Sequence, residues 1–327
     1  MNLQNPKKFK LLIDQAHQVA INVLRPISRK YDKAEHSYPK ELDMLASLVD
    51  GMNEGGEGMN AGAAVGKRGT NEQGNKNGVN LSTALSVIEM CYGDTALLLS
   101  MPRQGLGNSA IAAVANEEQL ERFKNTWAAM AITEPNCGSD SAAIRTTATK
   151  DGEDYILNGE KIFVTSGDRA DAIVVWATLD KKLGRSAIKS FVIPKGTAGM
   201  TVERLEHKLG IKASDTAVIR LIDCRVPANN LLGNAEIDIA KGFAGVMETF
   251  DNTRPLVAAM AIGCAKASLE RIKEIFSDCL DPQYITPYLQ TTHIASQIYR
   301  MEAEWEAARL LTLKAGWMAD NKKPNSK

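Results

Sequence analysis

Apolar side chains near the start of the chain recur at steps of four residues. This spacing puts them on one face of a helix and predicts a helix over residues 11–26. Pro26 should lie near the end of that helix, because a proline inside a helix removes a backbone hydrogen bond. The apolar positions are Leu12, Ala16, Ala20 and Leu24.

Three more helices are predicted from the same kind of pattern, so the first 125 residues or so are mainly helical. They run from near Pro39 to about Val49, over residues 81–101, and from Glu117 to about Phe123.

Residues 51–79 interrupt these helices. Gly, Asn and Glu dominate this stretch and large apolar residues are scarce, which predicts a loop. Residues 56–61 match a dinucleotide-binding fingerprint in form, and residues 62–68 come one residue short of a P-loop. Neither stretch follows a strand, so the structural context that these fingerprints require is missing.

The pattern changes to strands after about residue 129. Tyr155–Phe163 predicts two short strands around Asn158-Gly159, since Asn-Gly is a strong hairpin signal. Other strands, rich in β-branched residues, are predicted at 173–178, 188–194 and 217–225. Together they predict a small antiparallel β-domain.

Helical periodicity returns at Ile239 and continues to about Phe276, with Pro255 inside it, where the helix should kink or split. A last helix is predicted over residues 290–320. Its apolar stripe consists of Ile294, Ile298, Met301, Trp305, Ala308, Leu311, Ala315 and Met318.

The order of helices, strands and helices predicts an α+β multidomain protein. We expect an N-terminal helical domain at residues 1–128, a middle antiparallel β-domain at 129–238 and a C-terminal helical bundle at 239–327.

Composition excludes several classes of protein. The 327 residues are 44% hydrophobic and 24% charged, which is typical of a globular protein, and the formal net charge of zero disfavours a nucleic-acid binder. Five scattered cysteines without a C-x-x-C pair predict no disulfide framework and fit a reducing, cytoplasmic compartment. No apolar run reaches about 18 residues, so no membrane span is predicted. The histidines show no ligand spacing, so no metal site is predicted; they are His17, His36, His207 and His293.

Three separated stretches carry the candidate chemistry. Met130–Asp140 contains Thr-Glu-Pro followed by Gly-Ser-Asp, and Leu157–Gly167 contains Asn-Gly-Glu-Lys-Ile-Phe-Val-Thr. The third consists of Lys208–Thr216 followed by Phe250–Pro255. In order and spacing, across about residues 10–320, these stretches resemble the acyl-CoA dehydrogenase family.

The resemblance implies a four-helix C-terminal bundle and an FAD bound between domains. It implies that Ile132 and Thr133 meet the pyrimidine edge of the flavin. It also implies that Phe163, Val164 and Thr165 line one flavin face near N5, the hydride acceptor. Without the motifs, these threonines and Phe163 would be taken for ordinary strand and core residues. Met130, Gly138 and Ser139 complete the predicted FAD site, where the glycine lets backbone come close and the serine can bond a phosphate.

A substrate site is implied on the helix that contains Pro255. Asp251 and Arg254 lie three residues apart, hence on one helix face. In the family, matching residues hold the pantetheine and nucleotide parts of coenzyme A; the alternative is a surface ion pair of little energetic weight. Met247 and Phe250 either line the acyl channel or belong to the core. Ser139 is predicted to contact substrate as well as cofactor.

The sequence departs from the family pattern in three places. The catalytic glutamate usually lies in a C-terminal Y/F-E-G-T motif, which does not occur up to Lys327, and a minority of members carry it at the position of Thr253. The catalytic base is therefore unassigned. Residues 277–288 lack the arginine of the R-x-x-F-G segment that reaches the FAD of a neighbouring subunit. Only two of the four bundle helices are predicted, so we expect a C-terminally truncated chain, a fragment or half of a hetero-oligomer.

The sequence thus predicts an FAD-dependent oxidoreductase that α,β-dehydrogenates acyl-CoA thioesters, as in fatty-acid oxidation. An electron-transfer flavoprotein or similar acceptor and a homo- or hetero-oligomer are expected. The alternatives are a non-catalytic partner subunit that binds flavin or coenzyme A, and a related flavin-dependent oxidase or hydroxylase.

Overall fold

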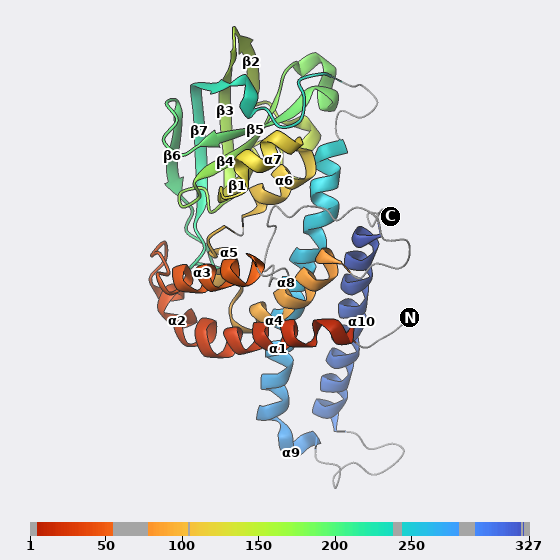
Figure 1. The fold of residues 1–327 in the computed structure, drawn as a ribbon. Coiled ribbons are helices and arrows are strands. Elements are labelled where there is room, and N and C mark those ends of the chain that lie inside the picture. The colour runs from red at the N-terminus through yellow and green to blue at the C-terminus, as the bar shows by residue number, and fades with distance from the viewer. Residues whose placement is uncertain are drawn as a thin grey trace. The chain divides into compact units, whose positions relative to one another are not determined.

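The computed structural model describes residues 5–54, 78–103, 105–237, 244–280, 292–321 and 323. These residues form two compact units (Figure 1). The helical unit lies within Met1–Ser28, Glu72–Leu98 and Arg254–Lys327, and the sheet unit within Arg29–Asn71 and Leu99–Thr253. Most of the predicted loop at 51–79, including both fingerprint-like stretches, lies outside the described residues. The predicted domain boundaries at 128 and 238 stay a prediction.

The first helix passes through Pro26, so the predicted end at this residue is wrong. Helix α1 (Lys10–Val19) leads into a π-helical turn (Ala20–Leu24) and then α2 (Arg25–Lys33). The π turn already shifts the hydrogen-bond register, with the Arg25 N–H donating to the Ala20 carbonyl. Pro26, which has no N–H, is tolerated directly after this shift.

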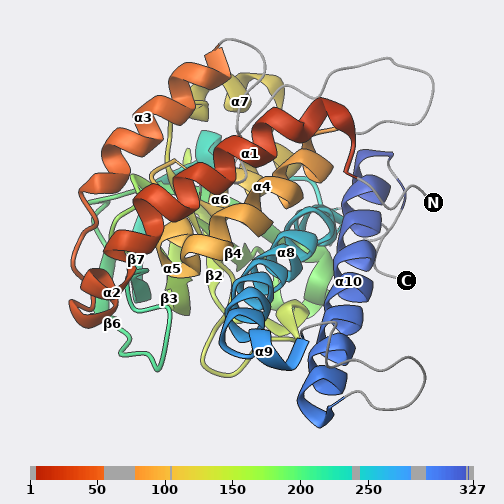
Figure 2. The same cartoon turned by 90° about the horizontal axis from the view of Figure 1, so that it is seen from below.

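Helices α1, α4 (Val79–Gly93) and α10 (His293–Asp320) pack together in the helical unit (Figures 1 and 2). Apolar residues cover most of the surface of α4, which is why helices pack on it from several sides. Asp320, the last residue of α10, accepts hydrogen bonds at the start of α4 from the backbone N–H groups of Gly78 (2.9 Å), Asn80 (2.9 Å) and Leu81 (3.1 Å). A carboxylate there satisfies amide groups that have no partner within the helix.

The apolar stretch predicted as one helix over 81–101 is two helices. Asp94 is extended and separates α4 from α5 (Thr95–Leu99). Its carboxylate accepts a hydrogen bond from the Leu97 N–H at 2.8 Å and thereby caps α5. Local capping chemistry therefore ends a helix that hydrophobic periodicity alone would continue.

The C-terminal helices begin with α8 (Ala244–Ile275), a single helix of 32 residues that contains Pro255, so the predicted split there is wrong. The short α9 (Ser277–Leu280) follows, and α10 confirms the helix predicted over 290–320.

Close packing of α8 on α4 requires a glycine: a Cβ on Gly263 would lie 2.3 Å from the Ile88 carbonyl oxygen. In the described part of the chain, no helix combines the length and apolar character needed to cross a membrane.

A seven-stranded sheet forms most of the sheet unit, in the order β1-β4-β2-β3-β7-β6, with β5 paired to β4. Most neighbours are antiparallel, as predicted, but β4 runs parallel to β1 and to β2. The strands are β1 (Ala128–Ala131), β2 (Thr147–Asp151), β3 (Asp154–Thr165), β4 (Ala172–Thr178), β5 (Ile188–Pro194), β6 (Met200–Leu205) and β7 (Thr216–Pro227).

Helices α6 (Leu106–Val114) and α7 (Glu117–Phe123) cover one face of this sheet, with Ile111 and Phe123 in the same buried cluster as Trp176 (Figure 1). The second cluster includes Phe191 and Leu157. Every residue of β4 is buried, because both sheet faces are covered there. Helix α3 (Glu41–Glu54) follows α2 along the chain.

The hairpin predicted at Asn158-Gly159 is wrong, because β3 runs through both residues as one strand. Pairing with β7 overrides the local turn preference, and the register shifts by a bulge between Leu157 and Gly159. Glycine is needed here, since a Cβ would lie 2.4 Å from the Thr146 hydroxyl oxygen. The turn itself is at Gly152 (φ +60°), which joins β2 to β3.

Candidate functional site

The two motifs at residues 130–140 and 157–167 meet in the sheet unit. The first follows β1 and the second occupies the end of β3, and the Ile162 N–H donates to the Thr133 carbonyl at 2.9 Å. Gly138 lies beside Thr133, where a Cβ would be 3.9 Å from its methyl carbon. Strand pairing thus brings together residues that are about thirty positions apart.

A buried ion pair joins these motifs. The side chain of Lys161, 0% exposed, donates to the Glu134 carboxylate at 2.7 Å and to the Ile132 carbonyl at 3.1 Å. Glu134 also accepts hydrogen bonds from the Arg145 N–H (2.7 Å) and from the Thr146 N–H (2.9 Å) and hydroxyl (2.6 Å). Burial by itself raises the pKa of Glu134, but the charge and hydrogen bond of Lys161 outweigh it and lower that pKa below its ordinary value. The lowered pKa keeps the Glu134 carboxylate ionised at neutral pH. Burial lowers the pKa of Lys161, and the charge and hydrogen bond of Glu134 oppose that lowering.

Sequence reasoning missed the role of this pair, although both residues lie inside the quoted motifs. A lysine within a strand otherwise rich in apolar residues was the available signal, because fully buried lysines are found almost only with a partner.

Phe163 breaks two rules of ordinary strand structure. Its backbone is in the left-handed region (φ +58°), and its side chain is 61% exposed while that of Val164 is 1% exposed. The cause is a second bulge, at which the register between β3 and β7 shifts between Lys161 and Val164. Strained backbone of this kind persists only where the surrounding structure holds it, and it is concentrated at binding sites.

The predicted hydrogen-bond donors flank this bulge. Thr133 and Thr165 are partly buried, and neither hydroxyl is engaged in a hydrogen bond with another residue in the part of the chain that the structure describes. Gly138 and Ser139 are exposed. An exposed aromatic ring next to uncommitted hydroxyls suits a flat heteroaromatic ligand with a polar edge, so these residues fit a flavin.

The remaining predicted FAD residues are more buried. Met130, on β1, is partly buried, and Ile132 is 8% exposed; both pack in the cluster covered by α6 and α7. They support the backbone of the motif, and their roles toward a cofactor stay predictions.

Four of the five predicted substrate residues lie on α8, and the fifth, Ser139, lies in the first motif. Phe250 is partly buried and packs against the same cluster as Ile111, Asp251 is partly buried and Arg254 is exposed. Asp251 belongs to the sheet unit and Arg254 to the helical unit. The backbone of Met247 lies in α8, and its side chain is outside the described residues. The substrate roles of these four residues stay predictions.

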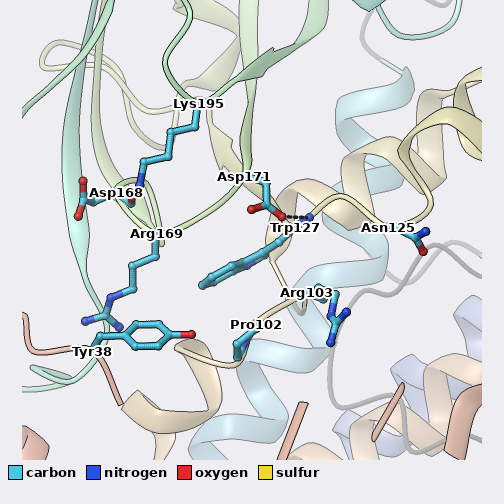
Figure 3. A pocket seen from close by; sticks show the side chains of 9 residues that line it. All are labelled: Tyr38, Pro102, Arg103, Asn125, Trp127, Asp168, Arg169, Asp171 and Lys195. Atoms are coloured by element: carbon cyan, nitrogen blue, oxygen red, sulfur yellow. Dashed lines mark hydrogen bonds between the residues drawn. The ribbon is translucent and has the colours of Figure 1, made fainter. Parts of the chain in front are cut away.

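A separate pocket of about 470 Å³ opens beside Trp127 in the sheet unit (Figure 3). Three of its charged groups have partners nearby: Asp171 accepts the backbone N–H of Trp127 at 3.0 Å, Lys195 donates to the Asp168 carbonyl, and the Arg169 guanidinium lies over the Tyr38 ring. None of the predicted site residues lines this pocket, so we treat it as separate from the candidate site.

Comparison with known proteins gives matches along the chain. Family models match residues 129–224 (acyl-CoA dehydrogenase, middle domain) and 240–327 (acyl-CoA dehydrogenase, C-terminal domain). The sequence is 33% identical to cyclohex-1-ene-1-carbonyl-CoA dehydrogenase of Syntrophus aciditrophicus, over 96% of this chain and 72% of that protein. It is 30% identical to the mitochondrial short-chain specific acyl-CoA dehydrogenase of Rattus norvegicus, over 100% of this chain and 76% of that protein. The butyryl-CoA dehydrogenase structure from Megasphaera elsdenii is similar with a TM-score of 0.76 and 29% identity, over 99% of this chain and 82% of that one.

Proposed function

Because this chain belongs to the acyl-CoA dehydrogenase family, we propose that it is an FAD-dependent oxidoreductase that dehydrogenates acyl-CoA thioesters between Cα and Cβ. The observation that carries this proposal is Phe163, an exposed aromatic side chain held on left-handed backbone beside Thr165. A bound FAD would accept the hydride from Cβ. The protein would supply the flat surface and the hydrogen-bond donors that position the ring.

In this proposal, the flavin edge is met by the segment after β1 and the flavin face by the end of β3. Thr133, with Ile132 before it, presents backbone and hydroxyl groups to the polar edge, while Phe163, Val164 and Thr165 lie along one face. The Ile162–Thr133 hydrogen bond and the Lys161–Glu134 ion pair fix the spacing between the two groups. Met130, Gly138 and Ser139 complete the cofactor site.

The substrate is proposed to bind along α8. Arg254 is exposed, and a guanidinium offers a planar fork of donors for the phosphate or amide groups of coenzyme A. Asp251 would accept hydrogen bonds from the same ligand, Ser139 would contact the thioester part, and Met247 and Phe250 would line the acyl chain. An electron-transfer flavoprotein or a similar acceptor would reoxidise the flavin, and the protein would act as an oligomer.

A second candidate function is that of a non-catalytic flavin- or CoA-binding subunit. The observation that favours it is Thr253, which is 5% exposed and occupies the position where a minority of the family carry the catalytic base. A threonine hydroxyl cannot take up the α-proton as a carboxylate does.

The cofactor proposal is tested by the absorption spectrum of the purified chain after incubation with FAD. We expect bound, oxidised flavin, and weaker flavin retention or a shifted potential in Thr165→Val. Thr149→Val is the matched control, because Thr149 is an exposed threonine on neighbouring β2. Failure to bind FAD, even with excess FAD and candidate partners present, would refute the cofactor assignment.

The substrate proposal is tested on α8. We expect Arg254→Ala to weaken acyl-CoA binding by roughly 1.5–3 kcal/mol, the scale of hydrogen bonds to charged groups. Thermal stability should change little because the side chain is exposed. Arg271→Ala, which removes another exposed arginine of the same helix, should leave binding unchanged. A large loss of stability with unchanged affinity would instead give Arg254 a structural role.

Anaerobic mixing with a range of acyl-CoAs separates the two candidate functions. An active dehydrogenase bleaches the flavin absorbance, whereas a binding subunit only shifts the spectrum. Bleaching that appears only in Thr253→Glu, with circular dichroism confirming its fold, would support the second function for the unmodified chain. Rapid bleaching by the unmodified chain would rule it out.

A further inference from the structure

The sheet unit brings together two histidines and a glutamate from distant parts of the sequence. Glu35 and His36 follow α2, and His207 follows β6. The potential ligand atoms of these three residues all lie within 4.8 Å of one another, and the two imidazole centroids are 5.3 Å apart. The spacing of the histidines along the sequence predicted no metal site. The fold, and not local spacing, brings these three residues together.

His36 is the residue that points to a ligand. Both of its ring nitrogens are buried, and neither has a hydrogen-bond partner among the described residues. A neutral imidazole carries one N–H donor and one lone pair, and leaving both without a partner away from water is unfavourable. The backbone of His36 is also in the left-handed region (φ +67°), which is uncommon for a residue other than glycine. A metal ion bound to one ring nitrogen would give that nitrogen the partner it lacks.

Glu35 supplies a suitable anionic oxygen. One carboxylate oxygen lies 2.9 Å from Nδ1 of His207, and the other accepts the Lys208 N–H at 3.0 Å. Groups of the segment after β6 thereby orient both carboxylate oxygens of Glu35.

The surrounding structure holds the cluster in place. Arg169 donates to the carbonyls of His36 (3.3 Å) and Ser37 (3.1 Å), and its own buried guanidinium lies 3.3 Å from Asp215. Such outer contacts orient ligands before a metal binds. The ammonium of Lys208 opposes a cation nearby, but it is turned toward the Ser214 carbonyl and the Thr216 hydroxyl at 2.8 Å.

We propose that Glu35, His36 and His207 form a binding site for a divalent transition-metal ion, best matched by Zn²⁺. Two imidazole nitrogens and one carboxylate oxygen suit zinc, whereas Mg²⁺ and Ca²⁺ take oxygen ligands. Metal–ligand distances of about 2.0–2.2 Å require the three groups to draw closer. His207 can do so because its side chain is 85% exposed. The ion would clip the turn after α2 to the segment after β6, independently of the proposed dehydrogenase activity.

The test uses the full chain, stripped with a chelator and titrated with Zn²⁺ by calorimetry against a competing chelator. We expect one equivalent bound per chain. His36→Asn and His207→Ala should each lower the affinity by at least about tenfold, the scale at which even outer-shell changes act. Asparagine is chosen at position 36 because it tolerates left-handed backbone. His293→Ala, which removes an exposed histidine at the start of α10, is the matched control and should leave affinity unchanged.

Co²⁺ gives a second, independent measurement. Its visible absorption should report nitrogen and oxygen ligands, without the sulfur-to-metal charge-transfer band that an exposed thiol such as Cys264 would produce. The proposal is overturned by the absence of a bound equivalent, by unchanged affinity in both His36→Asn and His207→Ala, or by a sulfur charge-transfer band that persists in these variants.

Discussion

Two buried glutamates, one in each unit, illustrate two ways to hold distant segments together. Glu134 is 6% exposed, and its partners are the fully buried Lys161 and groups of Arg145 and Thr146 whose positions are fixed by the backbone. Glu89 is 8% exposed, and within the described part of the chain its carboxylate bonds only to side chains, His17 at 2.9 Å and Lys266 at 2.8 and 2.7 Å.

The two glutamates differ in the solvent exposure of their partners. The side chains of His17 and Lys266 are 32% and 22% exposed, and Glu89 lines a pocket of about 360 Å³ in the helical unit. The Lys161 side chain is 0% exposed. A carboxylate with water-accessible partners can adjust, whereas one among buried partners is rigid. Glu134, the rigid one of the two, directly follows Thr133 of the candidate cofactor site, where fixed geometry matters most.

The largest effect is expected from Lys161→Met. It leaves the Glu134 charge buried without its cation, and breaking such a pair costs about 3–5 kcal/mol of the free energy of unfolding. Lys150→Met, an exposed lysine on β2, is the control and should change stability by less than about 0.5 kcal/mol. Denaturant unfolding measures both. A loss below about 1 kcal/mol in Lys161→Met would contradict the rigid-pair interpretation.

The pH dependence of that loss has a defined sign. With its pKa lowered, Glu134 stabilises the native chain above its unfolded pKa, and this contribution is lost as the pH falls through the folded pKa. In Lys161→Met the charge and the hydrogen bond of Lys161 are gone, whereas the hydrogen bonds from Thr146 and Arg145 stay. Burial is then less opposed, so the pKa of Glu134 is higher than in the parent. The stability difference between the two proteins should therefore shrink from neutral pH to about pH 4. A difference that grows on acidification would contradict this account.

An intermediate effect is expected from Glu89→Gln. It keeps the shape of the side chain but removes the charge that His17 and Lys266 contact, so we expect a loss of about 1–2 kcal/mol in the free energy of unfolding. Added salt should reduce this loss more than that of Lys161→Met, because salt screens accessible charges best. Glu274→Gln, in an exposed pair with Arg271, is the matched control and should have little effect.

The smallest effect on stability is expected from Phe163→Gly. Removing left-handed strain, about 1–2 kcal/mol, offsets the extra chain entropy of glycine, about 0.5–1 kcal/mol, and the lost ring is largely exposed. The variant should thus be as stable as the parent or slightly more stable, while it binds FAD less well. Phe163→Ala keeps the strain and should be the less stable of the two variants. The reverse order would show that the ring itself stabilises the fold.

Sequence patterns predicted elements well where local signals were unopposed. Helix α7 begins at Glu117, as predicted, and the capping box formed by Asn116 and Gln119 fixes that start. Strand β5, which contains β-branched residues, has the predicted bounds. Predictions failed where a tertiary contact overruled a local preference. Asn158-Gly159 is held extended by pairing with β7, and Pro26 is accommodated by a π turn. Helix α6 and strands β1, β2 and β6 were not predicted.

The candidate site was predictable only as motifs. The sequence indicated Thr133 and Phe163. The structure adds the hydrogen bond that joins the segment after β1 to β3, and the bulge at which the ring is exposed. Neither could be read from local spacing, because both depend on which strands become neighbours. The proximity of His36 and His207 could not be predicted either, because it also depends on which segments become neighbours in the fold.

The contact between Asp320 and the start of α4 has a consequence for synthesis of the chain on the ribosome. It joins residues about 240 positions apart, Gly78 and Asp320 being separated by 242. The sheet unit ends at Thr253, so it can close before α10 exists, while α1 and α4 must wait with part of their apolar surface uncovered. Closing so long a loop adds little entropy cost beyond that of a shorter one. The delay therefore affects the order of folding and the exposure to chaperones, and hardly the final stability.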